Sequence, residues 1–177
     1  MIKTDKKYSQ YLQILKEELI PAMGCTEPIA MAYAAAKARA VLGNMPEKID
    51  IVISGNIIKN VKSVIVPNTG GLKGITAAIA AGVAVGNADK QLEVLADVKQ
   101  EDIPKIAEFM NSCRMTVMKS QSDKLLDIDL HLYAGSDSVR LRITDQHTNI
   151  VLIEKNGKVL FDCLLYTSPS PRDGLLS

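Results

Sequence analysis

The stretch DIDLHLYAGSDSVRLRIT, residues 127–144, decides the fold class. In both of its halves apolar residues alternate with polar ones, the pattern of strands that bury one face. The apolar positions are Ile128, Leu130, Leu132, Val139, Leu141 and Ile143. Further strands are predicted over residues 149–154 and 158–162, on either side of Asn156-Gly157, a strong hairpin signal. Together these segments predict an antiparallel β-meander.

Upstream of the meander, the apolar spacing turns helical. A stripe predicts a helix over residues 8–20, which Pro21 ends. An Ala-rich helix is predicted over 26–42, with Thr26 as N-cap, Pro28 in the first turn and Gly43-Asn44 as the stop. A third helix follows the loop at 68–74 and ends near Gly86, and a fourth covers residues 103–110.

Two short β-branched runs, 48–54 and 62–66, predict strands between these helices. In the third helix Ala78, Gly82 and Gly86 recur every four residues, so another element should pack closely on that bare face. The fold class is therefore α+β: N-terminal helices with short strands, then an antiparallel meander of four or five strands packed on helices.

Composition excludes several classes of function. The 177 residues carry 21 Lys+Arg against 20 Asp+Glu, so no strong field attracts nucleic acid or an anionic membrane. The longest uncharged run is too short and too rich in Ala and Gly to cross a bilayer. No signal peptide is recognisable at the N-terminus, and three irregularly spaced cysteines argue against a secreted disulfide framework. We expect a cytoplasmic protein.

The last 15 residues, 163–177, lose the strand pattern and become rich in Ser and Pro. They could be a disordered tail. We favour the interpretation that CLLYTSPSPRDGLLS is translated adapter DNA, so that the native portion is residues 1–162. Re-sequencing the locus tests this, and native coding sequence running unbroken through Ser177 would contradict it.

The segment PAMGCTEP, residues 21–28, holds the best candidate for chemistry. Gly24 sets a tight turn, and Cys25 follows directly before a helix, where free N–H groups and the helix dipole favour a thiolate. Glu27 suits the same dipole and could supply a hydrogen bond. The alternative is that Cys25 is a small buried apolar residue. A Cys-His pair would need His131 or His147, and His131 lies on a polar strand face.

Other candidates are weaker. Thr69, Gly70 and Gly71 precede a helix, and their N–H groups could bind a carboxylate, or the loop could serve chain geometry alone. Lys59 could bind a carboxylate or form a Schiff base, yet an isolated lysine is usually a solvated charge. His147 and Asn149 open a predicted strand and could be turn residues. No metal site can be assembled from these residues.

Three strings resemble a known family in their order and spacing. They are EELIPAMGCTEPIAMAYAAAKA (17–38), SGNIIKNVKSVIVPNTGGLKG (54–74) and HTNIVLIEKNG (147–157). From Tyr8 to about Asp162 the chain resembles the N-terminal part of the serine dehydratase-like alpha-subunit family, whose characterised members are L-cysteine desulfidases.

The resemblance implies a lyase with a [4Fe–4S] cluster and no pyridoxal phosphate, which converts L-cysteine, or L-serine, to pyruvate, ammonia and hydrogen sulfide or water. It implies that Cys25 is the base that removes the α-proton, with Glu27 beside it. We assign substrate binding to Thr26, Lys59, Asn60, Thr69, Gly70, Gly71, His147 and Asn149. Its partners would be a small amino-acid substrate and, as an open alternative, further copies of the chain.

The chain also departs from the family. The cluster-binding cysteines of the family lie in a helical C-terminal half that this chain lacks, and neither Cys113 nor Cys163 occupies a cluster motif. We therefore expect the chain as written to bind no stable cluster and to be inactive. Two rivals remain: a non-catalytic module that binds a small carboxylate or serves assembly, and, ranked lower, a pyridoxal enzyme that uses Lys59.

Overall fold

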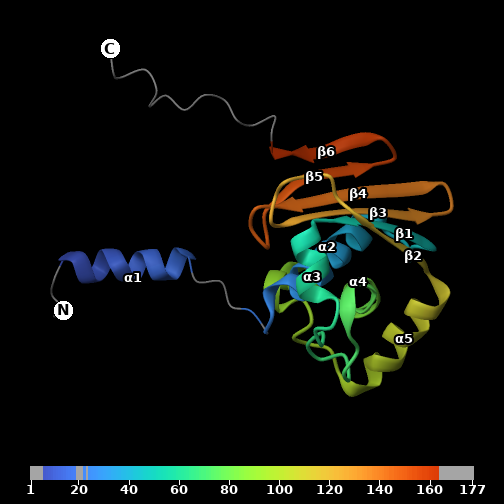
Figure 1. The fold of residues 1–177 in the computed structure, drawn as a ribbon, viewed down its shortest axis with the longest axis horizontal. Helices are drawn as coiled ribbons and strands as arrows, with labels where there is room; N and C mark the ends of the chain where they lie inside the picture. The colour runs from blue at the N-terminus through green and yellow to red at the C-terminus, as the bar shows by residue number, and fades with distance from the viewer. Residues whose placement is uncertain (1–5, 19–21, 23, 164–177) are drawn as a thin grey trace, which may run out of the picture.

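A six-stranded, mostly antiparallel sheet packed against helices forms the body of the protein in the computed structural model, which describes residues 6–18, 22 and 24–163. The strand order is β2-β1-β3-β4-β5-β6 (Figure 1). The strands are β1 Lys48–Ile53, β2 Arg114–Lys119, β3 Asp127–Ala134, β4 Asp137–Thr144, β5 Ile150–Lys155 and β6 Lys158–Asp162. β1 pairs parallel with β2 and antiparallel with β3. The α+β prediction is confirmed.

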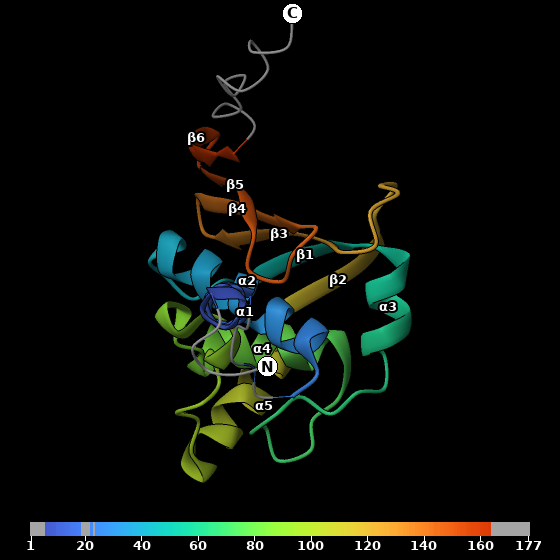
Figure 2. The ribbon, with the colours of Figure 1, turned by 90° about the vertical axis from the view of Figure 1, so that its left-hand side faces the viewer.

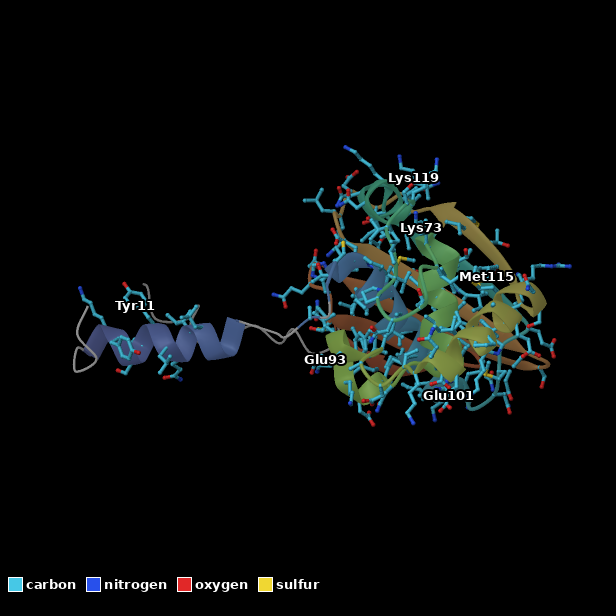
Figure 3. All side chains as sticks on the ribbon, turned by 90° about the horizontal axis from the view of Figure 1, so that it is seen from below. Tyr11, Lys73, Glu93, Glu101, Met115 and Lys119 are labelled. Carbon is cyan, nitrogen blue, oxygen red and sulfur yellow. The ribbon has the colours of Figure 1, made fainter. Side chains whose placement is uncertain are left out.

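Helices cover one face of this sheet (Figures 1 and 2). They are α2 Thr26–Leu42, α3 Gly55–Val61, α4 Gly74–Val85 and α5 Ile103–Ser112, with 3₁₀ turns η1 Ala88–Glu93 and η2 Gln100–Asp102. A further helix, α1 Lys6–Glu18, is not part of this layer. α2 contacts β3, β4 and β5 on one side and α4 on the other, so it is buried on nearly all sides. α1 lies to one side of the body, where Figure 3 labels Tyr11.

The helix α2 is fixed at its C-terminal end by a glycine and by a lysine from the sheet. Gly43 adopts a left-handed conformation (φ 84°), and its N–H donates to the Arg39 carbonyl, which terminates the helix as predicted. The Lys155 ammonium on β5 donates to the carbonyls of Val41 and Leu42, at 3.0 and 3.2 Å. At the other end the N-cap is Cys25 rather than Thr26, which is the first helical residue. The prediction of the N-cap is therefore wrong by one residue.

The predicted bare face of α4 packs on α2. A Cβ added at Gly82 would lie 2.1 Å from the carbonyl oxygen of Ala32, and one at Gly86 would lie 3.0 Å from Ala36 Cβ. Small residues on both helices therefore let the two backbones touch, and the close packing partner that the sequence called for is α2.

The segment after β1 differs from the prediction. Residues 62–66 do not form a strand; only Ile65 makes an isolated bridge, to Lys73. Just before them, where no element was predicted, the chain forms α3, because the Ser54 hydroxyl caps it by accepting from the Ile57 N–H at 3.4 Å, and Ile57 and Val61 bury one face at i and i+4. β2 was not predicted, and β1 joins the meander as a central strand, which gives six strands rather than four or five.

Among the described residues, no helix is long and apolar enough to cross a membrane. The predicted tail lies outside the described residues except for Cys163, as do Pro21 and the end of the predicted first helix.

Candidate active site

A tight turn places Cys25 at the start of α2. Gly24 has φ +148°, and a Cβ there would lie 3.4 Å from Pro67 Cγ, so this turn packs on the loop that precedes α4. Cys25 itself is extended (φ −61°, ψ 120°), is exposed, and makes no side-chain cap on the helix. Its thiol is therefore not engaged by the backbone of the helix start.

The carboxylate of Glu27 lies at the centre of a small polar cluster. The Cys25 thiol donates to Glu27 Oε2 at 3.2 Å, and the Asn60 amide donates to Glu27 Oε1 at 3.3 Å. The Thr26 hydroxyl approaches Oε2 at 3.5 Å. Asn60 comes from the last turn of α3, whose first turn is anchored by the Ser54 hydroxyl, which donates to the Leu125 carbonyl at 2.7 Å.

His147, in the turn between β4 and β5, acts on this cluster through its charge. It lies close enough to Glu27 for its positive charge to lower the pKa of that carboxyl group. The turn is fixed by Asn149, whose amide donates to the Thr144 carbonyl at 3.0 Å. Asn149 thus shapes the turn that carries His147, while the fold brings His147 to Glu27 across some 120 residues of sequence.

The pKa of the Cys25 thiol is shifted in the direction opposite to the one that a helix start alone would favour. Partial burial, together with the hydrogen bond to the Glu27 carboxylate and its negative charge, raises the pKa of the Cys25 thiol. Burial also acts to raise the pKa of Glu27, but hydrogen bonds from Cys25, the backbone and Asn60, with the charge of His147, outweigh it and lower the pKa. At neutral pH the cluster holds a thiol beside a carboxylate. The helix dipole alone does not make Cys25 a thiolate.

The loop at 67–74 is held together by a hydrogen bond from one of its own side chains, that of Thr69. Thr69 is buried, and its hydroxyl lies 2.8 Å from the Val66 carbonyl, to which it donates, and 3.5 Å from that of Leu72. Gly70 and Gly71 have φ of +70° and +96°, and a Cβ at Gly70 would lie 3.0 Å from the Ile103 side chain on α5. The backbone of the loop stays accessible, whereas the Thr69 hydroxyl is engaged within it.

Lys59 lies on the exposed side of α3 and makes no hydrogen bond or ion pair among the described residues. Figure 3 labels Lys73 and Lys119 at this end of the body. The loop at 67–74 therefore contacts the turn before Cys25, through Pro67 and Gly24. Lys59 is not part of the cluster around Glu27.

The open face of the sheet carries a polar network that the sequence reasoning missed. Arg142 donates to both carboxylate oxygens of Asp127, at 2.8 and 3.1 Å, and Arg140 to both of Asp129, at 3.0 and 2.7 Å. His131 lies beside Asp129, half-buried and in the middle of the sheet. Alternating acids on one predicted strand and arginines on the next were the available signal. Among the described residues the partner found for His131 is Asp129, and that found for the Cys25 thiol is Glu27.

The three cysteines do not fit an iron–sulfur cluster. Cys25 begins α2, Cys113 is buried at the end of α5, and Cys163 follows β6. Burial raises the pKa of Cys113 to about 11, the opposite of what a thiolate ligand requires. Within the described part of the chain, no group of three His, Cys, Asp or Glu residues could hold a metal ion. Ligands for a cluster would have to come from other polypeptide.

A hollow of about 480 Å³ lies between α5 and the turn before β1, and Cys25 does not line it. Lining residues include Met45, Ala84, Glu108 and Phe109. The Cys25 cluster is instead an open surface site.

The protein is thus of the α+β class: helices pack on a mostly antiparallel sheet. A thiol–carboxylate–amide cluster lies at the start of α2. Over about nine-tenths of its length the chain is homologous to UPF0597 proteins. It is 53% identical to one from Desulfitobacterium hafniense over 161 residues, which are 91% of this chain and 37% of that protein. It is 47% identical to one from Treponema denticola (88% and 36%) and 46% identical to one from Fusobacterium nucleatum (88% and 36%).

The chain therefore spans little more than a third of the length of the curated relatives that it matches. The names of these relatives state no reaction. No family model matches the chain, and no solved structure matches it.

Proposed function

We propose that the chain is the N-terminal part of a longer lyase that eliminates the β-substituent of L-cysteine or L-serine, giving pyruvate, ammonia and hydrogen sulfide or water. The supporting observation is the hydrogen-bonded cluster of Cys25, Glu27 and Asn60, together with His147, whose charge acts on Glu27. These residues come from the three strings that resemble the desulfidase family, and the fold gathers them at the start of α2.

The chemistry assigned to this chain is proton transfer. Cys25, as a thiolate, removes the α-proton of the bound amino acid, and loss of the β-substituent then leaves aminoacrylate, which tautomerises and hydrolyses. Glu27 and Asn60 fix the position of the thiol. A [4Fe–4S] cluster does not fit the cysteines of this chain, so departure of the leaving group is left to the remainder of the longer protein.

The open position of the cluster fits this division of labour. Elimination from an amino acid needs a site that excludes water, yet Cys25 and Asn60 are exposed on the surface of the body. We infer that additional polypeptide, proposed to be the helical C-terminal domain, completes the site. The chain by itself is then inactive.

The rival reading as a carboxylate-binding or assembly module draws less support. Its best feature was the loop at 67–74, but the Thr69 hydroxyl donates to the Val66 carbonyl instead of facing a ligand. The pyridoxal alternative rests on Lys59, which is a solvent-exposed charge.

Pyruvate and sulfide formation tests the reaction. The full-length relative from Desulfitobacterium hafniense, prepared without oxygen, is expected to turn over L-cysteine or L-serine, and the 177-residue chain is expected to do neither, even after reconstitution with iron and sulfide. A full-length protein inert towards both amino acids would refute the reaction class. A stoichiometric cluster with turnover in the chain alone would refute the division between two parts.

The role of Cys25 is tested in the full-length parent, whose coding sequence downstream of Asp162 should be determined first. Cys25→Ala is expected to lower turnover by about 10³-fold, since a positioned base contributes on this scale, and to leave the cluster absorbance intact. Retained turnover would rule out Cys25 as the base.

A further inference from the structure

The hydrogen bond between Cys25 and Glu27 sets the direction of the thiol proton. Sγ lies 3.2 Å from Oε2, and a carboxylate can only accept, so the proton of Cys25 points at Glu27. The second oxygen, Oε1, accepts from the Asn60 amide at 3.3 Å. Glu27 is thus held from two helices, with its charge beside the sulfur.

Two titratable groups are in contact here, Cys25 and Glu27 at the start of α2, and His147 in the β4–β5 turn acts on Glu27 through its charge. The charge of Glu27 acts on the thiol directly, whereas His147 acts on Glu27. A negative charge next to a thiol stabilises its protonated form, so the arrangement opposes the deprotonation that a base needs. Whatever neutralises Glu27 will therefore activate Cys25.

We propose that Glu27 is a positioning residue that keeps Cys25 protonated until the ammonium group of an amino-acid substrate pairs with the carboxylate. This inference rests on the proposed function for its substrate class. The Sγ–H bond then breaks, and the proton leaves to the water that still contacts Cys25 as the substrate binds, since this part of the protein leaves the residue exposed. The thiolate takes the α-proton of the substrate and becomes a thiol again, so the proton count balances. Substrate binding and base activation become one event.

Alkylation of Cys25 measures this coupling without any turnover. The intact 177-residue chain is treated with iodoacetamide at a series of pH values from about 6 to 10, and the peptide that contains Cys25 is followed by mass spectrometry, because only the thiolate reacts. In Glu27→Gln the alkylation profile is expected to move down by about one pH unit, so that Cys25 reacts up to about tenfold faster below its pKa. Glu108→Gln, which removes an exposed carboxylate from α5, is the matched control and should change nothing.

Glu27→Asp separates charge from structure. It retains the carboxylate, and we expect the slow profile of the wild type. A profile in Glu27→Gln that matches the wild type within about twofold would overturn the proposal. Equal acceleration in Glu27→Gln and Glu27→Asp would overturn it as well, because it would assign the effect to packing instead of charge.

L-Alanine tests the ammonium. It carries the amino and carboxyl groups of the substrate class but no leaving group. In the full-length parent, whose site is complete, saturating L-alanine is expected to accelerate Cys25 alkylation in the wild type at fixed pH and ionic strength, and to have no effect in Glu27→Gln. Absence of acceleration in the wild type would overturn the assignment to the ammonium group. These readouts do not depend on elimination, so they can succeed or fail separately from the proposed reaction.

Discussion

Replacement of Gly82 by alanine probes the contact on which the helical layer depends. The added Cβ would lie 2.1 Å from the Ala32 carbonyl oxygen and 2.8 Å from the Ala32 carbonyl carbon and Cα, and ordinary contact begins at 3.4 Å. The clash is with backbone, so no side chain can turn away. α2 and α4 would have to separate by about 1 Å in a close-packed interior.

The expected loss follows from two opposing effects. Overpacking of this kind costs about 3 kcal/mol, the upper part of its usual range, because the obstacle is rigid. Alanine returns up to about 1 kcal/mol through its better helix propensity. The free energy of unfolding should therefore fall by at least about 2 kcal/mol, which lowers Tm by roughly 4–8 °C for a chain of this length.

Thermal and urea unfolding followed by circular dichroism measure this change. Gly55→Ala is the matched control: it is also a glycine in a helix, but its added Cβ meets only the flexible end of Lys119, at 3.1 Å. It should stay within about 1 kcal/mol of the wild type. If Gly82→Ala were as stable as Gly55→Ala, the backbones of α2 and α4 would not touch, and the reasoning would be refuted.

Three further outcomes are expected. The paired arginine and His131 outweigh the effect of burial on Asp129 and lower its pKa from 3.8 to about 2. The stabilisation from this residue, about 2 kcal/mol, is therefore complete above about pH 5 and lost as the pH falls towards 2. Acid unfolding of Asp129→Asn should lack that loss, and an acid limb identical to that of the wild type would contradict it. Thr69→Val should cost about 1–2 kcal/mol in urea unfolding, because the loop loses its closing hydrogen bond, and a neutral effect would mean that the hydroxyl does not close the loop. Cys113, buried with a pKa of about 11, should resist alkylation near neutral pH until the protein unfolds, whereas labelling at the rate of a free thiol would show that the end of α5 is open.

Periodicity predicted most of the fold, because each predicted element carries its own signal. β3 and β4 alternate strictly, Asn156-Gly157 marks the β5–β6 turn, and α2 extends over the predicted range. β2 was not predicted because RMTVMK is an edge strand with exposed side chains on both faces, so apolar and polar residues do not alternate along it. α3 was not predicted because its β-branched residues favour a strand locally. The burial of Ile57 and Val61 against the body stabilises the helix instead.

The sequence predicted which residues lie at the candidate site, but not the protonation state of the Cys25 thiol. The start of the helix at Cys25 can be read from Gly24 and Pro28. The dipole argument failed because it omits the carboxylate two positions further on, whose effect depends on a distance of 3.2 Å that no sequence pattern supplies. The approach of His147 to Glu27 depends equally on the order of strands in the sheet.

The central place of β1 has a consequence for how the chain folds. β1 ends at residue 53, but both of its neighbours, β2 and β3, begin more than 60 residues later, so its pairing has a high contact order. During synthesis its apolar residues Ile49, Ile51 and Ile53 leave the ribosome long before a partner strand exists. The helices encoded between β1 and its partners are expected to form first and to shield this strand. β1 has both of its neighbours only when residue 134 has been made. Pairing of β1 is therefore expected to be a late step of folding, because it waits until both partner strands have been translated.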